Sequence, residues 1–153
     1  MTVQVNEARL RAALWEADRH CAALREALAD WHGLPAPCSA ALDQDSSLRR
    51  LTDQILYRFT KLQDTMGERL VPATLSSLLE SHDLWPMRDR LDRLEKLGFL
   101  DINQWLAWRD VRNRLAHEYP DAPELRHAAV LAAIAAASAL MSAYAHWKAA
   151  LSQ

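Results

Sequence analysis

Apolar residues recur every three or four positions over most of this chain, which is the period of an amphipathic helix and not of a strand. In a first stretch, about 6–31, the repeated positions are Leu10, Leu14, Ala17, Cys21, Leu24 and Leu28. In a second, about 46–66, they are Leu48, Leu51, Ile55, Phe59, Leu62 and Met66, with the spacing of a heptad seam. The pattern predicts two long helices, each with one buried face. The glycine and prolines of 33–45 predict a loop between them.

Helix breakers and caps place the later boundaries. Gly67 is expected to end the second helix, and Pro72 to begin a short helix that runs through Leu79. Pro86 is expected to begin the next helix, which ends where Gly98 can adopt the left-handed C′ conformation.

Two capping boxes, Asp101 with Gln104 and Asp121 with Glu124, predict the starts of the last two helices. The first of these is expected to run to about residue 118, because Pro120 prevents its continuation. The second is expected to run to about residue 151.

No stretch alternates like a strand, and no repeat is visible. The predicted fold class is therefore all-α: an antiparallel four-helix up-and-down bundle with one or two additional short helices. The chain has 153 residues, half of them hydrophobic, which suits a single globular domain over 1–153. Its two cysteines exclude a disulfide framework and a four-thiolate zinc site, and no metal or other cofactor is implied. Residues 1–11 lack the apolar core of a signal peptide, so a cytoplasmic location is expected.

The segment 128–147 has no Asp, Glu, Lys or Arg over twenty residues, a length that can cross a membrane. Ten of the twenty residues are alanine, and the larger apolar side chains Val130, Ile134, Met141 and Tyr144 fall mainly on one side. We therefore expect a buried or dimer-facing helix and no membrane span.

The net charge of −2 and pI of about 6.3 create no overall field that attracts nucleic acid. The basic residues, however, are fifteen arginines against three lysines. Arginine is suited to bidentate contact with carboxylate or phosphate, but a GC-rich genome would produce the same bias. Composition alone does not separate these two interpretations.

The most informative helix is the one expected over about 102–118. At about 100° per residue, Asp110, Asn113 and His117 share one stripe, and Arg109 and Arg114 flank it. Arg112 lies on the apolar side instead, beside Trp105 and Trp108. An arginine in that position must be paired, must extend its charge to water, or must face a second surface.

Each of these residues also has an ordinary structural interpretation. His117 could simply favour the negative end of the helix dipole, and Tyr119 could be an amphipathic residue at a helix exit. Arg114 could pair with Asp110 or Glu118 at helical spacing. The five other histidines show no metal-ligand spacing and are interpreted as structural: His20, His32, His82, His127 and His146.

The run from Arg112 to Tyr119 matches the R-N-x-x-x-H-x-Y motif of HEPN-domain proteins. The chain most resembles the HepT-type toxins of the HEPN/MNT (type VII) toxin–antitoxin systems, in the late position of the motif and in helix number and length. The resemblance covers essentially the whole chain.

The resemblance implies a metal-independent endoribonuclease whose active site forms at the interface of a homodimer. In this family His117 would be a general base or acid, Arg112 would stabilise the transition-state charge, and Asn113 would orient the histidine or the scissile phosphate. Arg109 and Arg114 would be candidates for contacts with the RNA backbone. The substrate would be an RNA, tRNA or mRNA, since the reaction needs a 2′-hydroxyl.

The resemblance also implies a protein partner. An MNT-type nucleotidyltransferase antitoxin would transfer AMP from ATP to Tyr119 and so block the toxin. The main alternative is a non-catalytic HEPN subunit that binds substrate for, or regulates, a nucleotidyltransferase. A helical scaffold with neither activity would leave Arg112 beside two tryptophans unexplained.

Overall fold

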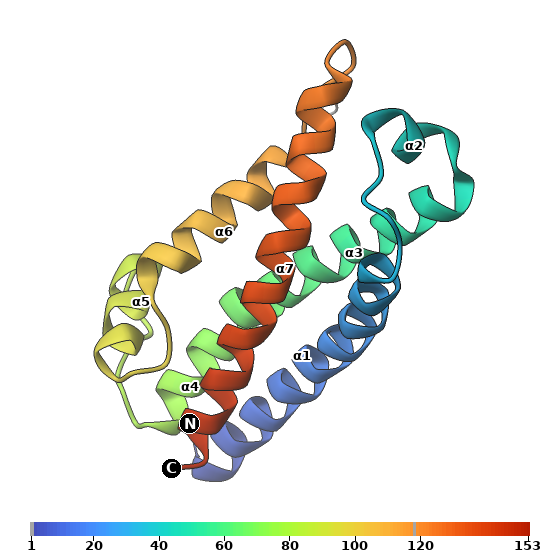
Figure 1. Ribbon diagram of the computed structural model, residues 1–153. Helices are drawn as coiled ribbons and strands as arrows, with labels where there is room; N and C mark the ends of the chain where they lie inside the picture. The colour runs from blue at the N-terminus through green and yellow to red at the C-terminus, as the bar shows by residue number, and fades with distance from the viewer. Residues whose placement is uncertain (1, 118) are drawn as a thin grey trace.

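The computed structural model describes residues 2–117 and 119–153, and it contains helices and no strand in that part of the chain (Figure 1). The all-α prediction is confirmed. The elements are α1 (Val3–His32), α2 (Ser39–Gln44), α3 (Ser46–Thr65), the π-helical segment η1 (Met66–Leu70), α4 (Val71–Ser77), α5 (Met87–Lys96), α6 (Ile102–Arg114) and α7 (Pro123–Leu151).

The first helix starts a few residues earlier than the apolar pattern predicts. Thr2 is its N-cap, and the Thr2 hydroxyl accepts a hydrogen bond from the backbone N–H of Val5 at 3.2 Å. The predicted buried face is present, because Ala17, Cys21 and Leu24 are each at most 5% exposed. This face packs mainly against α3.

Gly67 does not end the second long helix, contrary to the expectation. The chain continues from α3 through η1 into α4, and Gly67 lies buried in η1. A Cβ atom at this position would lie 3.2 Å from Cζ2 of Trp105. Glycine at this position therefore allows η1 to pack closely against α6 and does not end the helix. The π-helical turn accommodates the change in backbone hydrogen-bond register between α3 and α4. Pro72 is in the first turn of α4, as predicted.

The expected loop over 33–45 contains the short helix α2, which the sequence pattern did not predict. Six residues are too few for a stable helix in isolation, so tertiary contacts must hold it. Asp43 of α2 pairs with Arg126 of α7, and the Ser39 hydroxyl donates to the carboxylate of Glu124 at 2.7 Å. These contacts attach α2 to the start of α7.

The caps of the later helices are partly as predicted. Gly98 has φ +87°, the left-handed conformation expected after α5, and the Asp101 carboxylate accepts from the N–H of Gln104 at 3.0 Å at the start of α6. The second predicted capping box is wrong, because the N-cap of α7 is Ala122 and no side chain caps it. Helix α6 also ends at Arg114, earlier than predicted.

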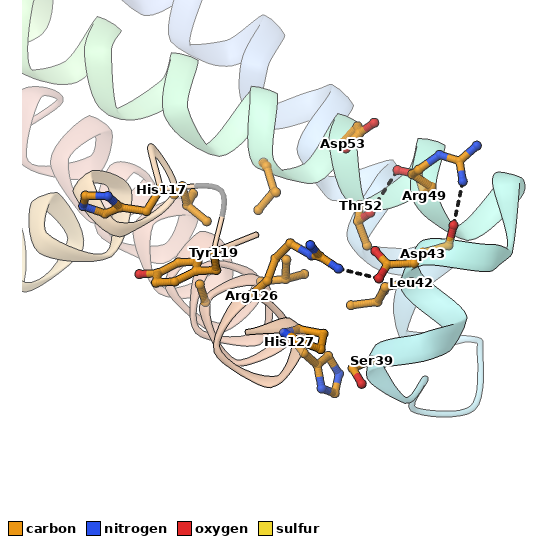
Figure 2. A pocket seen from close by; sticks show the side chains of 15 residues that line it. Ser39, Leu42, Asp43, Arg49, Thr52, Asp53, His117, Tyr119, Arg126 and His127 are labelled. Carbon is orange, nitrogen blue, oxygen red and sulfur yellow. Dashed lines mark hydrogen bonds and ion pairs between the residues drawn. The ribbon is translucent and has the colours of Figure 1, made fainter. Parts of the chain in front are cut away.

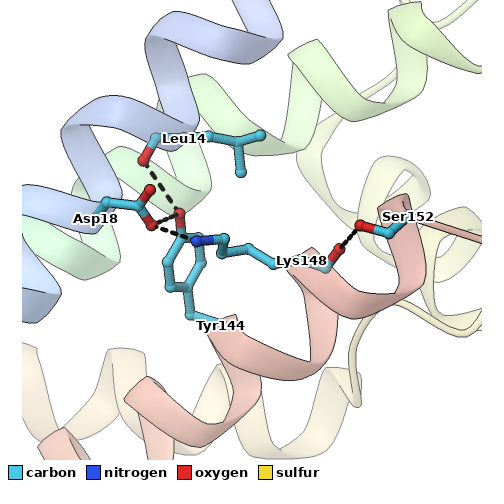
Figure 3. A network of polar contacts seen from close by, with 5 residues as sticks. All are labelled: Leu14, Asp18, Tyr144, Lys148 and Ser152. Carbon is cyan, nitrogen blue, oxygen red and sulfur yellow. Dashed lines mark hydrogen bonds and ion pairs between the residues drawn. The ribbon is translucent and has the colours of Figure 1, made fainter.

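Helix α7 is long and apolar enough to cross a membrane by length and composition, and one side of it packs against the other helices. Trp147 is fully buried and its indole N–H donates to the Thr74 hydroxyl at 3.0 Å. Tyr144 donates to the carboxylate of Asp18 at 2.7 Å, and Lys148 pairs with the same carboxylate (Figure 3). Burial, reinforced by this hydrogen bond, raises the pKa of Tyr144. These contacts join α7 to α1 and α4.

Candidate functional site

Arg112 is paired, which is one of the three outcomes that its apolar position predicts. Its guanidinium Nη2 lies 2.8 Å from the carboxylate Oδ1 of Asp64 in α3. The Arg112 side chain keeps 39% of its surface exposed, and Asp64 keeps 24%. The guanidinium is therefore held in place and is still accessible to a ligand from outside the chain.

The same pair borders a hollow of about 240 Å³ between η1, α3 and α6. Trp105 and Arg109 also line it. Gln63, 2% exposed, contributes an amide whose oxygen and nitrogen have no hydrogen-bond partner in the described part of the chain. A buried amide without partners needs water or another group beside it.

His117 is not on the helix that the sequence predicts for it. The chain leaves α6 after Arg114 in a tightened turn, in which the backbone N–H of His117 donates to the Arg114 carbonyl at 3.1 Å. The stripe shared with Asp110 and Asn113 therefore does not extend to His117. The turn instead carries the imidazole to the connection between α6 and α7, where it is exposed.

Tyr119 lies beside His117, with ring centroids 5.9 Å apart and planes tilted by 57°. Its φ is +47°, in the left-handed region that costs an aromatic residue about 1–3 kcal/mol. The Tyr119 carbonyl accepts from the N–H of Ala122, which closes the turn before α7. Tyr119 is half-buried, and Figure 2 shows its hydroxyl on the same side as the His117 ring, directed away from Arg126.

His117 and Tyr119 line a cavity of about 410 Å³ between α2, α3 and α7. Three basic residues that sequence reasoning did not assign to the site also line it: Arg49, Arg126 and His127. Arg126 pairs with Asp43, while Arg49 donates to the Asp43 backbone carbonyl at 2.9 Å (Figure 2). No spacing in the sequence relates residues 43, 49 and 126. Arg126 and His127 could have been suggested only by their position a few residues after the motif.

The other predicted site residues are arranged as follows. Arg114 pairs with Asp110 at 2.7 Å, which is the ordinary structural interpretation of Arg114. Its alternative partner, Glu118, lies outside the described residues. Asn113 is exposed, and Arg109 is exposed at the hollow of Arg112.

Within one chain, Arg112 and His117 are not brought into the same cavity. Arg112 borders the hollow between η1 and α6, whereas His117 borders the cavity beside α2. One chain thus offers an anchored guanidinium and an exposed imidazole on two neighbouring surfaces around the end of α6.

Among the residues that the structure describes, no three His, Cys, Asp or Glu side chains gather closely enough to hold a metal ion. The polar side chains that line the cavity of His117 are two imidazoles, a phenol, two guanidinium groups, two carboxylates and two hydroxyl groups.

No protein-family model matches the chain, and neither a curated protein nor a solved structure is significantly similar to it. The functional argument therefore depends on the residues themselves.

Proposed function

We propose that the protein is a metal-independent endoribonuclease that acts as the toxin of a toxin–antitoxin system, similar to the HepT-type HEPN proteins. The observation that carries this proposal is that Arg112 is held by Asp64 while still partly accessible, in a chain whose His117, five residues further on, is exposed. The ion pair fixes the direction of a guanidinium that remains partly accessible, and a fixed cation is what stabilises transition-state charge without reorganisation.

The separation of Arg112 and His117 within one chain fits an active site made by two chains. In a two-fold homodimer each motif contacts its copy, so Arg112 of one chain can lie opposite His117 of the other. The uncharged segment of α7 supplies an accessible surface of small residues for helix packing, including the exposed Ala135, Ser138 and Ser142. We propose that in each chain of such a dimer α1, α3, α6 and α7 form an antiparallel four-helix bundle. We also propose that the protein is cytoplasmic.

In this proposal His117 removes the proton from a ribose 2′-hydroxyl, which attacks the adjacent phosphorus. The bond from phosphorus to the 5′-oxygen breaks, and that oxygen takes up a proton. Arg112 stabilises the extra negative charge on the phosphoryl oxygens, and Asn113 orients the phosphate. The products are a 2′,3′-cyclic phosphate and a 5′-hydroxyl end. Arg109, which lies beside Arg112, contacts the RNA backbone, and so does Arg114.

The direct test is RNA cleavage by the purified chain in the presence of EDTA. We expect fragments of a labelled single-stranded RNA that end in a 2′,3′-cyclic phosphate. DNA of the same sequence should stay intact, because it lacks the attacking hydroxyl. An intact RNA, or a DNA cleaved at the same rate, would contradict the proposal.

We propose Tyr119 as the acceptor of AMP from an MNT-type nucleotidyltransferase antitoxin. Its phenol is partly accessible and lies close to His117, so a bulky anionic group there would repel and block RNA.

The test of this modification is the intact mass of the chain after incubation with ATP and the product of the neighbouring gene. We expect the mass to rise by one or more AMP units in the wild-type chain. Tyr119→Phe should gain none, whereas Tyr57→Phe, which changes a tyrosine that is 54% exposed, should gain the same mass as the wild type. Mass addition to Tyr119→Phe would exclude Tyr119 as the sole acceptor.

A second candidate function is a non-catalytic HEPN subunit that binds substrate for, or regulates, a nucleotidyltransferase. The observation that favours it is the same placement of Arg112 and His117 in different cavities, since a binding subunit does not need them together. Failure of cleavage combined with stable binding to the nucleotidyltransferase would favour this candidate.

A further inference from the structure

A second cavity of about 410 Å³ lies between the N-terminal half of α1, η1, α4 and the start of α5. It shares no lining residue with the cavity of His117. The proposed ribonuclease reaction makes no use of it.

Three arginines from three different elements line this cavity: Arg9 of α1, Arg69 of η1 and Arg90 of α5. Arg69 lies 3.3 Å from the carboxylate of Glu16, and Arg90 donates to the backbone carbonyl of His82 at 3.3 Å. Arg9 forms no ion pair within the described residues, so its charge is available to a ligand.

His82 provides a second, independent observation. It is 5% exposed, and its Nε2 lies 2.8 Å from the Ser76 hydroxyl. The other ring nitrogen, Nδ1, is buried without a partner, and so is Nε of Arg90. Burial, together with the charge of Arg90, lowers the pKa of His82 and so favours the neutral imidazole.

These atoms point to an acceptor. When the Ser76 hydroxyl donates to Nε2, the neutral imidazole carries its proton on Nδ1. The Nδ1–H of His82 and the Nε–H of Arg90 are then two donors without accessible surface, on two side chains that both line the cavity, so an acceptor in the cavity reaches them when these side chains turn toward it. An oxyanion oxygen is the group that satisfies such donors best, because charge-assisted hydrogen bonds are the strong ones.

We propose that this cavity binds a small phosphate monoester that also carries hydroxyl groups. The three arginines and the His82–Ser76 pair would hold the phosphate, and the volume suits a small ligand. The carboxylates of Glu68 and Asp83 line the same cavity and would accept from the ligand's hydroxyl groups. They offset two of the three positive charges, which disfavours a polyanion such as RNA.

The apolar part of the lining is consistent with a ligand larger than inorganic phosphate. It comes from one face of α1 and the first turn of α4: Ala12, Ala13, Pro72 and Ala73. These short side chains leave room for a carbon skeleton beside the arginines.

The test is isothermal titration of the full-length protein with ribose 5-phosphate as the probe. We expect saturable binding of one molecule per chain, and no binding of ribose. Arg9→Ala and Arg90→Lys should each weaken binding about tenfold, because Arg9→Ala removes a charge and Arg90→Lys removes the Nε donor while keeping the charge. Arg11→Ala is the matched control, since Arg11 is an exposed arginine of α1 that does not line the cavity.

Three results would overturn the proposal. They are the absence of saturable binding to a wild-type chain that is folded by circular dichroism, an equal loss in Arg11→Ala, and displacement of ribose 5-phosphate by a single-stranded RNA. The second would indicate non-specific attraction to positive charge, and the third would indicate a polyanion surface. None of these results depends on ribonuclease activity, so the proposed function is tested separately.

Discussion

Replacement of His117 by alanine is expected to lower the rate of RNA cleavage by about 10²–10⁴-fold, the contribution of a positioned general acid or base. The imidazole is exposed at the end of α6, so its removal leaves the core unchanged. The measurement is the single-turnover rate on a labelled RNA in EDTA, together with the unfolding midpoint. His32→Ala is the matched control, because it removes another exposed histidine next to a helix end. A full rate in His117→Ala would exclude this residue from the chemistry.

A mixture of two inactive variants tests how the site is assembled. If the guanidinium of one chain acts with the imidazole of the other, a heterodimer of Arg112→Ala and His117→Ala has one intact site and one that lacks both groups. Random pairing makes half of the dimers mixed, with one of two sites active, so about a quarter of wild-type activity should return. If each chain supplies both groups to its own site, no activity returns. The location of Arg112 and His117 in different cavities favours the first outcome.

Replacement of Trp147 by alanine is expected to lower the free energy of unfolding by about 3–5 kcal/mol. The side chain is fully buried, packs against the ring of Phe99 and donates to the hydroxyl of Thr74. Alanine leaves a cavity and also leaves the Thr74 hydroxyl, 0% exposed, without its partner. Because Trp147 joins α7 to α4, the loss affects the whole core and not one helix end.

Chemical denaturation followed by circular dichroism measures this change. Trp15→Ala is the matched control: Trp15 is 63% exposed and its ring centroid lies 4.9 Å from the Arg19 guanidinium. We expect this variant to lose at most about 1 kcal/mol, the size of an exposed cation–π contact. Equal losses in the two variants would show that burial of Trp147 does not determine the stability of this fold.

Local chemistry was sufficient to place many helix boundaries from the sequence. Asp101 caps α6 and Gly98 takes the left-handed conformation after α5, as expected, because each depends only on residues one turn away. The same kind of inference failed at Gly67, where packing against Trp105 overrides the tendency of glycine to end a helix. It also failed at Asp121, since Glu124 is engaged by Ser39 of α2.

The sequence by itself determined the all-α class, the buried faces of the long helices and the prediction that Arg112 must be paired, extend its charge to water or face a second surface. These follow from periodicity and from the cost of an unpaired charge on an apolar face. Only the tertiary structure decided that the partner is Asp64, that His117 leaves the helix, and that the two face different cavities. These features depend on contacts between residues that are distant in the chain, or on how the end of one helix packs against another helix. No local sequence pattern specifies such contacts.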